Sequence, residues 1–495
     1  MPRQLFPFAE WLPDLPPWEN PGALTAKNVI PGPNSYKSFP NQVVFSTSLS
    51  ARCQGAIIAR DLAGNFYNYA GDSSALYALN GTSWSSTTRL AGGAYATNSE
   101  DFWEFVQWGE TVIGVNGIAA ANAPQRISLG AANFINLPGA PPTARHIAVV
   151  RDFVVLGNVS AAPQTVRWSA INNSDSWTAD AATLADSQQL PGDGGWIQKI
   201  IGGEYGIIFQ ERAIWRMTFV GSPLIFQFDQ IHRNIGAYAP QSVIGFQNYA
   251  FFLSEDGFYQ FDGVNVKPIG NGKVDRTFLA DLDTGFYNRI QAGIDPLNKL
   301  VMWAYPASGN SGGNPNKILI YSWGFDRWSI VEDVNIELLT RNVSGAYTLE
   351  GLDAITTDLD ALPASLDSRR WNAGQILSSC FDANHRLNNF NGSAMAATVD
   401  TGEINFNQKM NGRTYITEVR PNVGGLSASA QIVVLSRNAL TESSSAIAAQ
   451  TTNATGFAPV RSTARYHRFR TTTTNNVNFD NLYNIEVVYH VDGDR

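Results

Sequence analysis

The chain has 495 residues, of which 12% are aromatic and only 15% are charged, and its formal net charge is −8. This length allows about three domains of roughly 150 residues, or fewer if one is a large β domain. The composition excludes no class of soluble fold. The sequence contains no stripe of basic residues that would displace phosphate counterions, which argues against a protein that binds nucleic acid tightly.

The acidity is uneven along the chain. Residues 395–495 hold nine Lys and Arg against eight Asp and Glu, a net charge of +1, so the first 394 residues carry −9. An acidic surface repels a phosphate backbone over about 8 Å at physiological salt. If DNA lies near this protein, the sequence favours DNA that moves past the surface over DNA that is bound to it.

Residues 1–41 predict an extended Pro-rich arm rather than a domain, because prolines at short intervals remove backbone donors and fix φ. The arm is too apolar for a free linker, so we expect it to lie on a folded surface of its own chain or of a neighbour. This N-terminal segment lacks the apolar core of a secretory signal, and no run of about 18 apolar residues occurs elsewhere. The candidate inter-subunit contacts of the arm are Phe6, Phe8, Trp11 and Trp18.

Residues 42–392 predict a central β-propeller. Short strands rich in aromatic and β-branched residues follow one another, and no amphipathic helix of three turns interrupts them. Asn-Gly and Asp-Gly pairs supply the positive φ of two-residue type I′ hairpin turns, and such a unit returning at roughly 40–60 residues is typical of propeller blades. The hairpin motifs are 77–84, 258–266 and 318–328, with looser copies at 131–137 and 168–177.

Residues 393–495 contain further strands without this blade pattern, which favours a separate β-sandwich-like domain. In the segment Arg465–Arg470, Arg468 and Arg470 share one strand face while His467 and Phe469 share the other. Arg465, Arg468 and Arg470 are therefore a candidate partner-contact strand, with simple exposure to solvent as the alternative. The chain as a whole is expected to be all-β.

Four segments resemble a family of tail nozzle or tail hub proteins from short-tailed bacteriophages. They are Glu10–Leu24, Phe252–Gly263, Ser365–Trp371 and Asn453–Arg470. The resemblance implies a virion structural protein of the tail, made in the host cytoplasm, that forms a homohexameric ring below the portal and adaptor. Such a ring retains packaged DNA and conducts it during ejection. Tail fibre or spike proteins and tail-tip proteins are the other implied partners, and no catalytic residue, metal or cofactor is implied.

Acidic segments are the candidate lining of such a channel, with ordinary solvated loops as the alternative interpretation. The residues concerned are Asp281, Asp283, Asp353, Asp358, Asp360 and Asp367. A wall of this charge would keep a moving duplex off the protein surface.

Two other functions stay open. A carbohydrate-binding or glycan-degrading tail protein is possible, although glycosidases need two carboxyl groups about 5 to 9 Å apart and the adjacent pairs Glu100-Asp101 and Glu255-Asp256 would point to opposite strand faces. A C-terminal adhesin-like domain is the third possibility.

The five histidines have no metal-ligand spacing, and the distant Cys53 and Cys380 are expected to be buried thiols.

Overall fold

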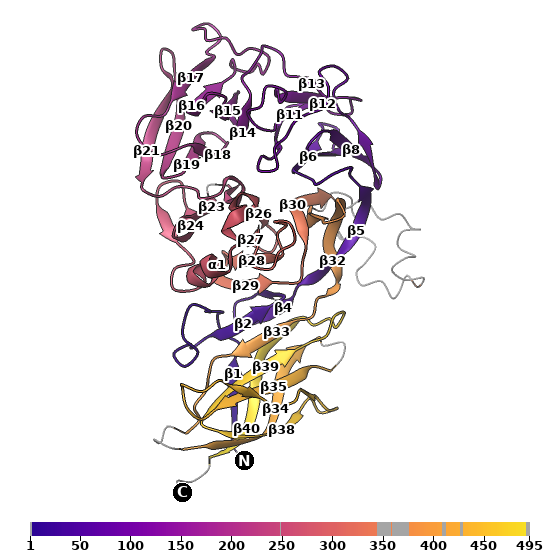
Figure 1. The fold of residues 1–495 in the computed structure, drawn as a ribbon, viewed down its shortest axis with the longest axis vertical. Coiled ribbons are helices and arrows are strands. Elements are labelled where there is room, and N and C mark those ends of the chain that lie inside the picture. The colour runs from indigo at the N-terminus through magenta and orange to yellow at the C-terminus, as the bar shows by residue number, and fades with distance from the viewer. Residues whose placement is uncertain are drawn as a thin grey trace. The chain divides into compact units, whose positions relative to one another are not determined.

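The structure is a computed structural model that describes residues 2–247, 249–343, 358, 376–407, 412–425 and 429–491. It is an all-β protein, and the described residues contain one α-helix, α1 (Asp275–Asp281), beside the strands. The chain divides into two compact units (Figure 1). We call Val43–Glu255 with Ile336–Phe390 the blade unit, and Met1–Gln42 with Asp256–Asn335 and Asn391–Arg495 the composite unit.

The blade unit begins with four consecutive antiparallel sheets of four strands each, which is the architecture of propeller blades. The strands of the first two blades are β6 (Gly55–Arg60), β7 (Phe66–Gly71), β8 (Leu76–Asn80), β9 (Ser83–Ser86), β10 (Glu104–Trp108), β11 (Thr111–Val115), β12 (Gln125–Ser128) and β13 (Ile135–Asn136). Those of the next two are β14 (Ala144–Val150), β15 (Phe153–Val159), β16 (Ala162–Trp168), β17 (Asp186–Gln189), β18 (Ile197–Ile201), β19 (Gly206–Gln210), β20 (Ala213–Gly221) and β21 (Ile225–Arg233).

A fifth blade of this unit combines distant parts of the sequence. Its strand order is β30-β31-β32-β5, so an N-terminal strand completes a sheet whose other three strands come after residue 335. Its strands are β5 (Pro40–Ser48), β30 (Ile336–Val343), β31 (Ile376–Asp382) and β32 (Arg386–Ala394). A short 3-10 segment, η1 (Pro240–Ser242), and the hairpin of β22 (Ile244–Phe246) and β23 (Tyr249–Ser254) follow the fourth blade.

Apolar side chains fill the spaces between neighbouring blades. The first strands of successive blades lie side by side, as β6 does with β10 and β10 with β14. Between the first two blades, Tyr69 and Phe134 meet edge to face at 5.5 Å, and the indole of Trp103 donates to the carbonyl of Asp72 at 2.8 Å. Such aromatic pairs stabilise packing beyond their burial alone. The apolar residues that alternate along the strands therefore form the contacts between neighbouring blades.

The tight hairpins are confirmed, but their turns differ from the expected type. In the β8–β9 hairpin, Asn80 pairs with Ser83, so Gly81 and Thr82 form the two-residue loop. Gly81 has a φ of 61° while Thr82 is not among the residues of positive φ, which is the pattern of a type II′ turn. The motifs at 258–266 and 318–328 have four-residue loops instead, because Asp262 and Asp326 occupy loop positions rather than strand ends.

The composite unit contains one blade-like meander that continues into a larger sheet. The strand order is β26-β27-β28-β29-β2-β33-β39-β35-β36, with β37 also paired to β35. Its strands are β2 (Ala23–Lys27), β26 (Gln291–Asp295), β27 (Leu300–Tyr305), β28 (Lys317–Ser322), β29 (Arg327–Val331), β33 (Thr398–Thr401), β35 (Gln431–Arg437), β36 (Ser445–Ala446), β37 (Gln450–Thr451) and β39 (Tyr466–Thr472). The hairpin of β24 (Gly257–Phe261) and β25 (Val266–Pro268), α1 and the 3-10 segment η2 (Thr284–Arg289) precede β26.

A second sheet of the composite unit has the order β3-β4-β40-β34-β38, and β1 also pairs with β40. Its strands are β1 (Arg3–Pro7), β3 (Val29–Pro31), β4 (Tyr36–Ser38), β34 (Thr414–Gly424), β38 (Ala458–Ala464) and β40 (Asn481–Val491). All strands expected from the sequence of residues 393–495 are present, and they form two sheets together with N-terminal strands.

The expected division into 1–41, 42–392 and 393–495 differs from the observed units. The N-terminal segment is not a separate arm, because β1 to β4 are hydrogen-bonded members of the two C-terminal sheets. Phe8 and Trp11 are buried, Phe6 lies edge to face on Phe406 at 5.3 Å, and only Trp18 is exposed. Three of the four expected inter-subunit contacts are therefore engaged within this chain.

Candidate functional site

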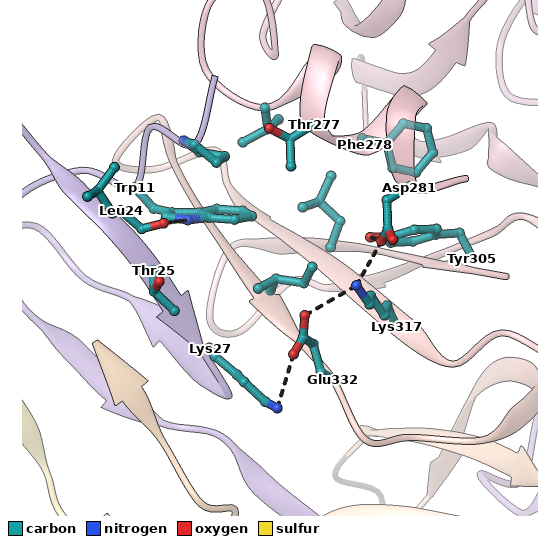
Figure 2. Close-up of a pocket in the computed structure, with 14 residues that line it drawn as sticks. Trp11, Leu24, Thr25, Lys27, Thr277, Phe278, Asp281, Tyr305, Lys317 and Glu332 are labelled. Atoms are coloured by element: carbon teal, nitrogen blue, oxygen red, sulfur yellow. Dashed lines mark hydrogen bonds and ion pairs between the residues drawn. The ribbon is translucent and has the colours of Figure 1, made fainter. Parts of the chain in front are cut away.

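A pocket of about 320 Å³ lies in the composite unit where the N-terminal segment meets α1 and the β26–β29 meander (Figure 2). One wall is apolar and contains the indole of Trp11. The other wall carries two lysines and two carboxylates, whose side chains point toward one another. The lining residues are Trp11, Pro13, Leu24, Thr25, Lys27, Val274, Thr277, Phe278, Asp281, Tyr305, Lys317, Leu319, Ile330 and Glu332.

The charged wall is a chain of alternating ion pairs. Lys27 Nζ lies 3.0 Å from Glu332 Oε2, and Lys317 Nζ lies 3.3 Å from Glu332 Oε1 and 2.8 Å from Asp281 Oδ2 (Figure 2). These four side chains remain between 22% and 30% exposed, so solvent reaches the array. Hydrogen bonds to the carboxylates raise the pKa of both lysines, although desolvation acts in the opposite direction and is the largest single effect. Both ammonium groups therefore stay charged at neutral pH.

Backbone contacts fix Trp11 and Glu332 at the pocket. Trp11 forms a parallel bridge with Ala23 and its indole Nε1 donates to the carbonyl of Leu24 at 3.1 Å. The backbone N–H of Glu332 donates to the side chain of Asn28, a buried residue with a φ of 57° just after β2. The pocket walls are thus set by the backbone of β2 and of the residues that follow β29.

The N-terminal segment also caps α1. Val274 at the start of the helix offers no side-chain cap. Asp14 supplies it instead, accepting from the backbone N–H of Arg276 at 3.0 Å and from the N–H and hydroxyl of Thr277 at 2.8 and 2.7 Å. A carboxylate in this position satisfies orphan amide groups and complements the helix dipole. This contact holds Pro13 and Trp11 over the pocket.

The arrangement suits binding rather than bond cleavage. A glycosidase places its two carboxyl groups on either side of the scissile bond, whereas the ammonium group of Lys317 contacts both Asp281 and Glu332. Burial and the bond to Asp281 raise the pKa of Tyr305 well above its usual value, so this phenol does not serve as a base at neutral pH. What the pocket offers is an apolar wall opposite a polar one.

A second polar cluster lies in the blade unit on the first strands of neighbouring blades. Glu104 of β10 contacts His146 Nδ1 at 3.0 Å and Lys199 Nζ at 2.7 Å, and the side-chain amide of Gln241 donates to it at 2.9 Å. Lys199 and His146 lower the pKa of this buried carboxyl to about 2 despite its desolvation. The cluster ties three successive blades and η1 together by charge-assisted bonds.

The two predicted acidic lining residues near α1 are part of the chain's own bonding. Asp281 ends α1 and binds Lys317 and Tyr305. Asp283 caps η2 through Gly285 and accepts from the side chain of Asn310 at 2.7 Å. Neither belongs to a freely solvated loop, and the role of these two residues as channel lining stays a prediction.

Asp358 is exposed, while Asp353, Asp360 and Asp367 lie outside the described residues. The role of these four carboxylates as channel lining stays a prediction.

The predicted partner-contact residues lie on β39 or directly before it, and two of them share one acidic partner within the chain. Arg470 binds the fully buried carboxylate of Asp400 at 2.8 Å, and Arg468 lies 3.6 Å from the same group. Arg465 lies over the ring of Tyr466 at 5.3 Å. His467 faces the interior as expected and is buried beside Phe406, where neither ring nitrogen has a hydrogen-bond partner among the described residues.

The remaining expectations concern metals, thiols and membranes. Within the described residues no group of three His, Cys, Asp or Glu side chains is arranged to hold a metal ion. Cys53 and Cys380 are free and buried, as expected, and burial raises the pKa of both thiols. No helix in the described part of the chain is long and apolar enough to cross a membrane.

Comparisons with known proteins give fold likeness only. No family model matches the chain, and no curated protein matches it. The Pan2 WD40 domain of Neurospora crassa is similar at 8% identity with a TM-score of 0.37, covering 68% of this chain and 88% of that one. The β-propeller domain of Cps50 (Swd1) from Myceliophteria thermophila is similar at 9% identity with a TM-score of 0.32, covering 74% of this chain and 98% of that one.

Sequence reasoning did not find the pocket or the Glu104 cluster. Lys27 and Glu332 are separated by some 300 residues, and no local spacing connects them. For Glu104 and His146 one signal existed, since both are charged or titratable residues at the start of strongly apolar strands. A titratable side chain in such a position needs a partner when it is buried.

Proposed function

We propose that this chain is a structural protein of a phage tail, the nozzle or hub through which the genome leaves the virion. The observation that carries the proposal is the resemblance of four segments to that family. Glu10–Leu24 and Asn453–Arg470 belong to the composite unit, Phe252–Gly263 includes residues of both units, and Ser365–Trp371 lies outside the described residues. The resemblance is therefore not confined to one unit of the chain.

Physical considerations support a passage enclosed by a ring of several copies rather than a passage through the channel of one propeller. The channel of one propeller is normally filled by its own strands, so duplex DNA needs a passage between several copies. Cyclic symmetry provides it by repeating one heterologous contact until the ring closes, here as a proposed hexamer. The net charge of −9 over the first 394 residues would disfavour phosphate binding along that passage. Portal and adaptor would dock at one end, and fibre, spike or tip proteins at the other.

The test is the assembly state of the purified full chain, alone and with its adaptor. We expect a discrete six-fold mass in native mass spectrometry and rings in negative-stain images, with no retention of duplex DNA at about 150 mM salt. A chain that stays monomeric even with the adaptor present would contradict the proposal, as would tight DNA binding.

A glycan-degrading tail protein remains the second candidate because the pocket places two carboxylates within reach of one another. Release of sugars from host polysaccharide by the purified chain, abolished in Asp281→Asn or Glu332→Gln, would favour it. The position of Lys317 between these carboxylates argues for the structural role instead.

A further inference from the structure

We propose that Arg468 is the docking point for a carboxylate of a second copy of this chain. The contact would lie on the face of β33, β35 and β39 that carries Arg437, Arg468 and Arg470, here called the arginine face. This inference rests on the proposed function and deepens it, because it names one side of the contact that a ring repeats. Three observations support it: an excess of positive charge, an arginine without a hydrogen-bonding carboxylate, and a partly uncovered strand face.

The arginine face carries one positive charge more than its own carboxylates balance. Asp400 is fully buried and accepts from Nε and Nη2 of Arg470, both at 2.8 Å. The carboxylate of Glu403 accepts from Nε of Arg437 at 3.2 Å. Each carboxylate thus has an arginine of its own, and Arg468 reaches Asp400 only at 3.6 Å. Within the described residues, these five side chains sum to a charge of +1.

The guanidinium of Arg468 is poorly compensated by its surroundings. Its buried Nε has no hydrogen-bond partner among the described residues, and a separation of 3.6 Å from Asp400 is too long for a hydrogen bond. Desolvation lowers the pKa of this arginine, and the charges of Arg470 and Arg437 act in the same direction. A partly buried cation is stabilised by a further anion. A carboxylate or a phosphate would fit, because a guanidinium offers parallel N–H donors to either.

The strand face around Arg468 is only partly covered. Successive residues of β39 alternate between faces, so His467 is buried in the interior while Arg468 and Arg470 lie on the opposite face, 19% and 34% exposed. Val433, which pairs with Arg470, and Tyr466 are half-buried on this same face. Arginine beside aromatic and apolar groups is typical of protein contacts. An incoming protein surface can therefore reach Arg468.

The distribution of charge favours a second copy as the partner. Residues 1–394 carry −9 and residues 395–495 carry +1, so a neighbouring copy offers acidic surface to this face. A contact between two different surfaces of identical chains is heterologous, which is the kind that closes into a ring. Duplex DNA is less favoured as the source of the anion. Asp400 and Glu403 lie beside Arg468, and one uncompensated charge neutralises a single phosphate at most.

The first experiment compares assembly of the full chain, with its adaptor, in the unaltered form and in Arg468→Gln and Arg461→Gln. Arg461 is an exposed residue of β38 in the same unit, so both variants lose one positive charge and differ in its position. Arg468→Gln should raise the concentration at which half of the subunits are assembled by about tenfold or more in native mass spectrometry. Arg461→Gln should raise it by less than about threefold, as expected for an exposed charge. Circular dichroism and thermal unfolding of the unassembled Arg468→Gln chain should match the unaltered chain.

The second experiment identifies the partner group. Arg468→Lys places an amine at this position, and a carbodiimide then couples it to an adjacent carboxylate. Mixing unlabelled and 15N-labelled chains separates cross-links between copies from those within one copy. We expect peptides of mixed labelling that join residue 468 to a carboxylate of another copy.

The outcomes distinguish this inference from the proposed function. Assembly that survives Arg468→Gln, or cross-links from residue 468 that reach only Asp400 of the same copy, would overturn the inference and leave the ring proposal intact. An unaltered chain that stays monomeric with its adaptor would overturn both. Duplex DNA that is retained by the unaltered chain and lost in Arg468→Gln would also overturn the inference, because the partner group would then be a phosphate.

Discussion

Single carboxyl groups of this chain have opposite pKa shifts because their surroundings differ. Lys199 and His146 hold the pKa of Glu104 near 2. Asp275 accepts from the backbone N–H of Phe258, and its burial, with Asp14 and Asp256 nearby, raises its pKa to about 7. A buried carboxylate that contacts Lys199 and His146 is stabilised, and one beside other carboxylates is not.

Asp275→Asn should therefore stabilise the protein at alkaline pH. The pKa of Asp275 is about 7 in the fold against 3.8 ordinarily, so its contribution to stability is complete below pH 4 and is lost as pH rises toward 7. The asparagine variant should be more stable by about 1–3 kcal/mol at pH 8 and similar at pH 4. Urea midpoints at both pH values measure this. The exposed Asp229→Asn is the control, and an equal change in both variants would contradict the explanation.

His467 has the opposite pH dependence. Burial lowers its pKa to about 4, so between pH 6.5 and 4 the unfolded chain binds a proton that the fold does not, and stability falls as pH drops through this window. His467→Phe removes two ring nitrogens that have no hydrogen-bond partner in the described part of the chain, and it should raise stability at pH 5 by about 1–3 kcal/mol relative to its effect at pH 8. Thermal unfolding at the two pH values tests it, and a pH-independent effect would show that the imidazole is not the titrating group.

At the scale of elements, short segments depend on partners far away in the sequence. Helix α1 has seven residues and no cap of its own, and isolated helices of this length are unstable in water. Asp14 provides the missing acceptor. The first two blades also depend on a residue distant in sequence. Trp103 packs so closely on the backbone of Gly71 that a Cβ at Gly71 would lie 2.5 Å from Cδ1 of Trp103.

Asp14→Ala should cost about 1–2 kcal/mol, since it leaves two helix amides without acceptors. Asp14→Asn retains an acceptor oxygen and should lose less. Hydrogen exchange at residues 276–281 provides the local readout. Faster exchange in the alanine variant than in the asparagine variant is expected, and identical exchange in both would mean that the carboxylate does not cap the helix.

At the scale of the whole molecule, the N-terminal segment is structural. Removing residues 2–17 deletes β1 and the cap of α1, and it uncovers the edge of β40. We expect the truncated chain to be destabilised by several kcal/mol and to aggregate through that strand edge. Size-exclusion chromatography and circular dichroism measure this. A truncated chain that stays soluble and folded but does not form rings would instead support the inter-subunit role expected from the sequence.

The positions of individual strands could be predicted well from the sequence, whereas the pairing of strands that are distant in the sequence could not. Alternation in segments such as Val112–Val115 and Ile485–Tyr489 identifies strands, because side chains of a strand alternate between faces. The alternation does not say which strand pairs with which, so it predicts an arm at residues 23–27, where β2 in fact lies between β29 and β33. Phe8 and Trp11 indicated burial correctly. Nothing in a single sequence indicated that the surface covering them belongs to the same chain.

The late completion of the β5 blade has a consequence for synthesis on the ribosome. β5 emerges early, but β32, its neighbour in the sheet, begins at residue 386. At about 5–20 residues per second, roughly 20–70 s separate the two strands during translation. During that delay a nine-residue strand lacks its native neighbour, which makes the nascent chain a substrate for chaperones and a risk at high expression rates. Slower translation beyond residue 48 would lengthen this exposure, whereas a circular permutant that places β5 after β32 would remove it.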